Sequence, residues 1–222
     1  MGRQKPVTRM ETQQLIESLA HGLQPVRRWR RPGWRALGWL LVIGVVAAVL
    51  VLRFANLTVF AQRMAVPRVA VDCAATAITG VTAVFAAFRL SVPGTSLRWA
   101  LLPAPSFVTW LAASGLGCLR NGWVNHGSGG IIGESRHCIV FILAVSVPLA
   151  VALFAALRRA RPIAPVPVTV LGMLGVAALS AFLLQFFHPF DVTAIDLGVH
   201  LTAIALVILM GLAVRRPALT TP

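Results

Sequence analysis

The sequence predicts an all-α, polytopic membrane protein, in which a six-helix transmembrane bundle follows a short cytoplasmic amphipathic helix. Of its 222 residues, 58% are hydrophobic and only 12% are charged, a balance that excludes an ordinary soluble domain. The apolar residues form six stretches, each long enough to cross a hydrocarbon core that needs roughly 20 helical residues. From first to last, the stretches are residues 36–52, 69–88, 99–116, 138–157, 166–187 and 195–214.

The basic residues predict which side of the membrane each loop faces. Fifteen of the 20 Lys and Arg residues lie before the first stretch, after the second, after the fourth or after the sixth. Because loops rich in Lys and Arg stay in the cytoplasm, both termini are expected there. The chain then divides into a cytoplasmic segment (1–35), a transmembrane domain (36–214) and a cytoplasmic tail (215–222). No cleavable signal peptide is expected, and translation could start at Met1 or Met10.

Residues 11–24 are predicted to form the amphipathic helix. One stripe of a helix with 3.6 residues per turn contains its apolar residues Leu15, Ile16, Leu19 and Leu23. A helix that lies on a membrane surface usually carries Lys and Arg on its polar face, whereas this one carries Glu, Gln, Ser and Thr. The pattern favours insertion into a groove on a cytoplasmic partner protein. A helix lying flat on the inner leaflet is the alternative.

Residues 25–35, PVRRWRRPGWR, form a basic and aromatic collar before the first span. Tryptophans at such positions anchor a protein at the headgroup level, and arginines there bind anionic lipid. Most of the basic residues flank spans in this way. The formal net charge of +14 therefore indicates contact with membrane lipid rather than direct binding of nucleic acid.

The second and third spans have distinctive small residues and prolines. Ala74, Ala75 and Gly80 allow a neighbouring helix to approach the second span closely. Pro103 and Pro105 are predicted to kink the third span. No nucleophile and base lie at matching depth, and spans 1, 2, 4 and 5 lack charged residues near their centres. Neither an intramembrane hydrolase nor a transporter is therefore expected.

Reactive side chains are concentrated on the predicted outer side, which has all three cysteines and four of the five histidines. Cys118 and Cys138 bound the loop between the third and fourth spans. In an oxidising periplasm they could form a disulfide worth roughly 3 kcal/mol. The alternative is a pair of thiolates that bind a soft metal ion or react with oxidants. Cys73, beside Asp72 at the start of the second span, is expected to be a small buried residue instead.

Residues 188–200, HPFDVTAIDLGVH, contribute further metal-binding side chains. Asp196 and His200 are four residues apart and therefore share a helical face. Imidazoles and carboxylates bind divalent metals, and together with thiolates they suit copper or zinc. The predicted ligands are Cys118, Cys138, His188, Asp191, Asp196 and His200. A hydrogen-bonded polar group that joins spans five and six is the alternative, so no cofactor is assigned with certainty.

The chain resembles the NrsF-type family of bacterial anti-sigma factors over about residues 10–214. The segments that carry the resemblance are TQQLIESLAHGLQPVR, FRLSVPG, RWALLPAP, WLAASGLGCLR, LLQFFHPFDV and DLGVH. The resemblance implies a bacterial inner-membrane protein that holds an extracytoplasmic-function sigma factor inactive and releases it under heavy-metal or oxidative stress. It also implies that helix 11–24 belongs to the sigma-binding part, and that Cys118 and Cys138 belong to the sensing part. The ligand role of the histidines and aspartates is our inference from their chemistry.

The sequence therefore predicts a regulatory membrane protein and not an enzyme. A membrane thiol oxidoreductase is one alternative, and the absence of a CxxC pair argues against it. A small metal-handling membrane protein is the other. The expected partners are the sigma factor and membrane lipid, and a homodimer is left open.

Overall fold

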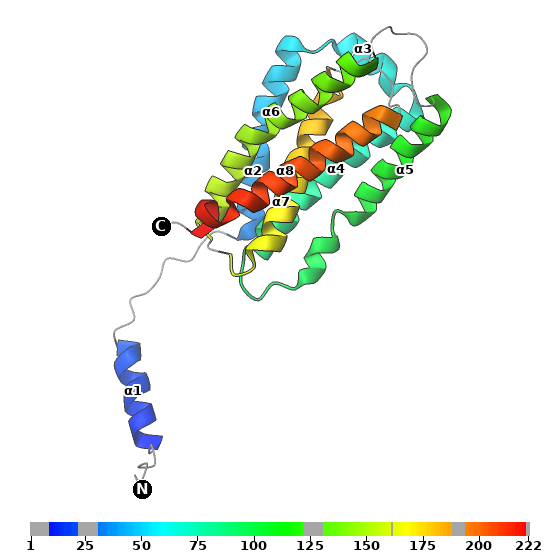
Figure 1. Cartoon of the computed structure of the whole chain (residues 1–222). Coiled ribbons are helices and arrows are strands. Elements are labelled where there is room, and N and C mark those ends of the chain that lie inside the picture. Colours follow the sequence, from blue (N-terminus) through cyan, green and yellow to red (C-terminus); the bar gives the residue numbers. More distant parts are fainter. Residues whose placement is uncertain (1–8, 22–30, 122–130, 161, 188–193, 221–222) are drawn as a thin grey trace. The chain divides into compact units, whose positions relative to one another are not determined.

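The computed structural model describes residues 9–21, 31–121, 131–160, 162–187 and 194–220 (Figure 1). Their elements are α1 (Arg9–His21), α2 (Pro32–Phe54), α3 (Leu57–Met64), α4 (Pro67–Leu90), the 3-10 helix η1 (Leu97–Leu101), α5 (Ala104–Asn121), α6 (Ile131–Arg158), α7 (Pro165–Leu184) and α8 (Ala194–Thr220). The described residues contain no strand, which confirms the all-α prediction. The chain divides into two units, residues 1–30 and residues 31–222, and the second contains the helical bundle.

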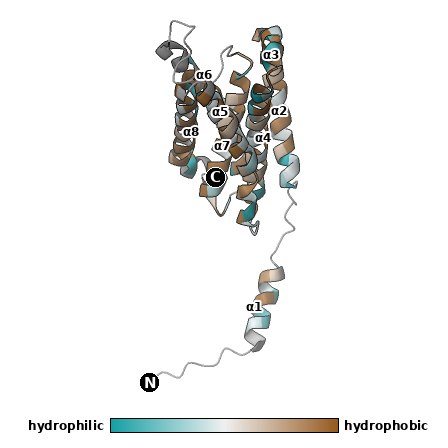
Figure 2. Cartoon of the chain, turned by 90° about the vertical axis from the view of Figure 1, so that its right-hand side faces the viewer, coloured by the Kyte–Doolittle hydropathy of each residue, from teal (hydrophilic) through white to brown (hydrophobic). Residues whose placement is uncertain are grey.

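The six predicted spans are confirmed as six long apolar helices. In the described part of the chain, the helices long and apolar enough to cross a membrane are Pro32–Phe54, Pro67–Leu90, Leu97–Gly117, His137–Arg158, Pro165–Leu184 and Ile195–Arg215. Five predicted stretches lie inside these helices, and the stretch 166–187 runs past the end of its helix at Leu184. Figure 2 shows hydrophobic residues along the whole length of the bundle.

Proline residues set where several helices begin. α2, α4 and α7 start at Pro32, Pro67 and Pro165, where the ring fixes a helical φ and the missing N–H would be unpaired anyway. In the third span, Pro103 and Pro105 lie where η1 gives way to α5. The third span is confirmed, and its two prolines lie at the junction between a 3-10 helix and an α-helix. Two prolines without N–H donors interrupt the hydrogen-bond ladder there.

α4 and α7 lie at the centre of the bundle, and they pack most extensively against each other. Their backbones approach closely at two glycines. A Cβ added to Gly175 would lie 2.9 Å from the backbone N of Val84 and 3.0 Å from the carbonyl oxygen of Gly80. A Cβ added to Gly80 would in turn meet Leu179. Close packing through small residues, as predicted for the second span, is confirmed at Gly80.

α3 is a short helix that the sequence analysis did not predict. It lies between the first two spans, and the side chain of Asn56 caps it by accepting a 3.2 Å hydrogen bond from the backbone N–H of Val59. Phe60 and Met64 are four residues apart and share one apolar face of the helix. Eight residues are too few to cross a bilayer, so hydropathy over a span-length window does not detect this helix.

Candidate functional site

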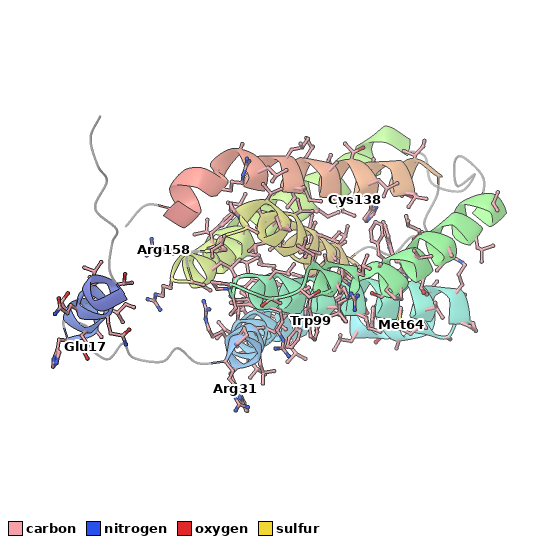
Figure 3. The ribbon with its side chains drawn as sticks, turned by 90° about the horizontal axis from the view of Figure 1, so that it is seen from below. Glu17, Arg31, Met64, Trp99, Cys138 and Arg158 are labelled. Atoms are coloured by element: carbon pink, nitrogen blue, oxygen red, sulfur yellow. The ribbon has the colours of Figure 1, made fainter. Side chains whose placement is uncertain are left out.

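The two ends of the bundle differ in their polar residues. Figure 3 shows Cys138 and Met64 toward one end, and Arg31 and Arg158 toward the opposite end. We refer to these as the Cys138 end and the Arg158 end. α4, α6 and α8 begin at the Cys138 end, and α5 and α7 finish there. Among the described residues, Asp72, Cys73, Cys138, Asp196 and His200, which the sequence predicts to face outward, therefore lie at the same end of the bundle.

Asp72 of α4 is the buried polar centre of the Cys138 end. The residue is only 2% exposed. Its Oδ1 accepts a 2.5 Å hydrogen bond from the hydroxyl of Ser114 on α5, and its Oδ2 accepts a 2.9 Å hydrogen bond from Nε2 of Gln185, which follows α7. A carboxylate removed from water is tolerated when its oxygens are paired in this way. The two hydrogen bonds connect three spans.

His200 of α8 lines the same small pocket as Asp72, together with Trp110 and Leu197. Its Nδ1 lies 2.7 Å from the backbone oxygen of Asp196. A carbonyl oxygen only accepts hydrogen bonds, so Nδ1 must have the proton, and in the neutral ring Nε2 is the acceptor or metal-binding nitrogen. The pocket thus joins α8 to the three spans that meet at Asp72. Asp196 and His200 share one helical face, as their spacing predicts.

Cys138 is buried where α6, α7 and α8 meet. It is 1% exposed and packs with Ile142, Ala181 and Ala203. A metal ion or oxidant therefore reaches this thiol only if the helices separate at this point. Cys73 is also buried, which confirms the prediction for that residue.

The structure describes part of the predicted metal site. His188 and Asp191 lie outside the described residues, as does the side chain of Cys118, whose backbone belongs to α5. Among the side chains that are described, no three His, Cys, Asp or Glu residues come together as a group that could hold a metal ion. The six-ligand metal site and the alternative disulfide between Cys118 and Cys138 both stay predictions.

α1, which is described over Arg9–His21, exposes the apolar stripe that the sequence predicts within 11–24. Leu15, Ile16 and Leu19 are 58%, 56% and 64% exposed. Leu23 lies outside the described residues. An exposed apolar stripe on an otherwise polar helix is typical of a surface that binds a partner.

Two arginines are held in place at the Arg158 end. Arg35 of α2 donates a 2.5 Å hydrogen bond to the backbone oxygen of Ala156, and its guanidinium lies 5.4 Å from the ring centroid of Phe88. The guanidinium of Arg89 lies 4.7 Å from the ring centroid of Trp99. These cation–π contacts fix positive charge at the end of the bundle that the sequence predicts to be cytoplasmic.

The sequence analysis missed most of the polar centre. It assigned no role to Asp72, and it did not single out Ser114 or Gln185. The sequence contained one signal for this centre, which is the position of Asp72 inside an apolar span. An ionisable residue at such a position has to find polar partners. The identity of those partners depends on how the spans rotate against one another, which hydropathy does not report.

The chain was also compared with known proteins. A family model described as NrsF, negative regulator of sigma F, matches residues 19–220. The match covers the bundle and the last residues of α1. Comparison with curated proteins and with solved structures gives no match.

Proposed function

The chain belongs to the NrsF family of negative regulators of sigma F, and from this premise we propose how it acts. It is an anti-sigma factor of the bacterial inner membrane that holds an extracytoplasmic-function sigma factor inactive. The six spans anchor the complex to the membrane, with both termini in the cytoplasm. α1 binds the sigma factor.

The exposed stripe of α1 carries this proposal. Leu15, Ile16 and Leu19 are exposed on one side of α1, and amphipathic helices insert apolar faces of this kind into protein grooves. The opposite face has Gln14 and Glu17 rather than Lys or Arg. That polar face favours a protein partner over an anionic lipid surface.

The decisive experiment measures how much sigma factor the full-length protein captures with and without the substitution Leu19→Glu. Burying a leucine stabilises a complex by about 1.5–3 kcal/mol, so the charged variant should bind at least about tenfold more weakly. Gln14→Glu is the matched control, because it adds the same charge on the opposite face of α1 and should leave capture unchanged. Equal capture by the two variants would show that the stripe does not bind the sigma factor.

The second part of the proposal is the release signal. A soft metal ion such as copper or zinc, or a thiol oxidant, acts on the cysteines of the Cys138 end and stabilises a different packing of the bundle. The burial of Cys138 among three spans supports this part, because any reaction at its thiol has to change their packing. By linkage, a 100-fold weaker hold on the sigma factor needs a coupling free energy of about 2.7 kcal/mol.

Cys118→Ser tests the release signal. The variant should keep the sigma factor bound but should lose induction of a sigma-dependent reporter by copper and by diamide. Cys73→Ser is the control and should induce normally, because that cysteine lies outside the predicted pair. Constitutive reporter activity of Cys118→Ser would show that this cysteine is structural and not sensory.

A further inference from the structure

A cavity of about 280 Å³ lies at the Cys138 end, between the last residues of α2, the helix α3 and the residues that follow α7. It is a different pocket from the one around Asp72, although Gln185 lines both, and none of its described lining residues is a predicted metal ligand. The residues that line it are Phe54, Asn56, Val59, Phe60, Arg63, Gln185, Phe186 and Phe187. Four of these eight described residues are phenylalanines, so aromatic rings make up half of the described lining.

Stacked rings hold the aromatic wall in place. The rings of Phe60 and Phe186 are stacked with their centroids 4.2 Å apart, and Phe182 packs edge-on against Phe186. These contacts link α3 to the end of α7. A wall braced in this way is preformed, as apolar ligand sites usually are.

Arg63 contributes a guanidinium to the cavity wall. Its Nη1 donates a 3.0 Å hydrogen bond to the backbone oxygen of Gln185, which holds the side chain against the cavity wall. A guanidinium fixed beside apolar rings is the group that recognises carboxylate or phosphate oxygens in proteins. The chemistry of the cavity therefore suits a molecule with an apolar body and an anionic head.

The position of the cavity fits such a molecule. α3 joins the end of α2 to the start of α4, so it lies at the membrane surface if those two helices cross the bilayer. Its apolar face includes Phe60 and Met64, and Gln62 lies between them on the polar side. Short amphipathic helices of this kind lie at the boundary between headgroups and acyl chains.

We propose that this cavity is a binding site for an acyl-chain amphiphile with an anionic head. The phenylalanines hold the methylene groups nearest the head, and Arg63 binds the carboxylate or phosphate. A free fatty acid and an anionic phospholipid of the bilayer share this chemistry. No cysteine is among the site's described lining residues. It shares one residue with the polar centre, because Gln185 accepts from Arg63 through its backbone and donates to Asp72 through its side chain.

Photo-crosslinking of the full-length protein tests the proposal for a fatty acid. A palmitate with a diazirine on its chain should label α3 and the segment around Phe186, as mapped by mass spectrometry. Unlabelled palmitate should compete, and hexadecanol, which lacks the charge, should not. Arg63→Gln should lower labelling about tenfold, the loss expected when a charge-assisted hydrogen bond is removed. Arg53→Gln is the matched control, because Arg53 lies at the same end but does not line the cavity.

A second variant and a second probe complete the test. Val59→Trp fills the cavity and should also abolish labelling, which keeps the test valid if Arg63→Gln fails to fold. Native mass spectrometry tests whether the ligand is instead an anionic phospholipid of the bilayer. The protein is released from nanodiscs of phosphatidylglycerol or of phosphatidylcholine, and the lipid that stays bound is identified. Retention of phosphatidylglycerol that depends on Arg63, without palmitate labelling, would identify the bilayer lipid as the ligand. Equal competition by hexadecanol and palmitate, or labelling that neither variant changes, would overturn the proposal.

Discussion

The hydroxyl of Ser114 donates a 2.5 Å hydrogen bond to the buried carboxylate of Asp72, and so joins α5 to α4 inside the bundle. Gln185 donates to the other oxygen of the same carboxylate and adds the end of α7. Hydrogen bonds to a charged group gain strength away from water. This polar centre therefore fixes the register of three spans whose remaining contacts are largely apolar and non-directional.

Ser114→Ala should destabilise the bundle. The substitution leaves one oxygen of Asp72 without its partner, which costs about 1–3 kcal/mol in the free energy of unfolding. Thermal unfolding in detergent, followed by tryptophan fluorescence, would measure the loss. Thr202→Ala is the control, because that exposed hydroxyl only donates to the backbone oxygen of Gly198 in its own helix. Equal melting temperatures for the two variants would contradict the role of Ser114.

Gly175→Ala should also destabilise the bundle, because the new Cβ would lie 2.9 Å from the backbone N of Val84 and would force α4 and α7 apart. Overpacking of this kind costs about 1–3 kcal/mol. Gly38→Ala on α2 is the matched control. Outside the local backbone of α2, no described atom lies within 4 Å of its added Cβ, so the helix propensity of alanine should leave stability equal or slightly higher. A stabilising Gly175→Ala would show that the two helices do not approach as described.

The thiol of Cys138 should react slowly with maleimide in the folded protein. The residue is 1% exposed, and reagents react with accessible thiolates. The measurement needs reducing conditions and a background with Cys73→Ser and Cys118→Ser. His137→Cys in a background that also has Cys138→Ser is the control, because His137 is exposed at the neighbouring position. Fast labelling of Cys138 at rest would mean that the bundle is open there without a signal.

Reporter fusions should place the two ends of the bundle on opposite sides of the membrane. Alkaline phosphatase inserted after residue 120 should be active, because it would reach the periplasm. A fluorescent protein fused to the C-terminus should fluoresce in the cytoplasm, because 15 of the 20 Lys and Arg residues lie on the side of the termini. The reverse result would place the cysteines in the cytosol and would remove the basis for a periplasmic signal.

Some features follow from the order of residues alone, because they depend on local physical rules. The length of each apolar stretch is set by the thickness of the hydrocarbon core, so the six spans could be predicted within a few residues. The apolar stripe of α1 follows from the 3.6-residue period, and it is exposed as expected at Leu15, Ile16 and Leu19. The family could also be inferred from the sequence, because its motifs are short continuous segments.

Other features depend on how the helices rotate and slide against one another, and no local rule gives that information. Asp72 is paired with Ser114 and Gln185 because α4, α5 and α7 meet in one particular register. The aromatic cavity beside Arg63 exists because α3 folds back toward the end of α7. Side chains far apart in the chain become neighbours only when the helices pack. The apolar character of a span does not determine which of its faces contacts which neighbouring helix.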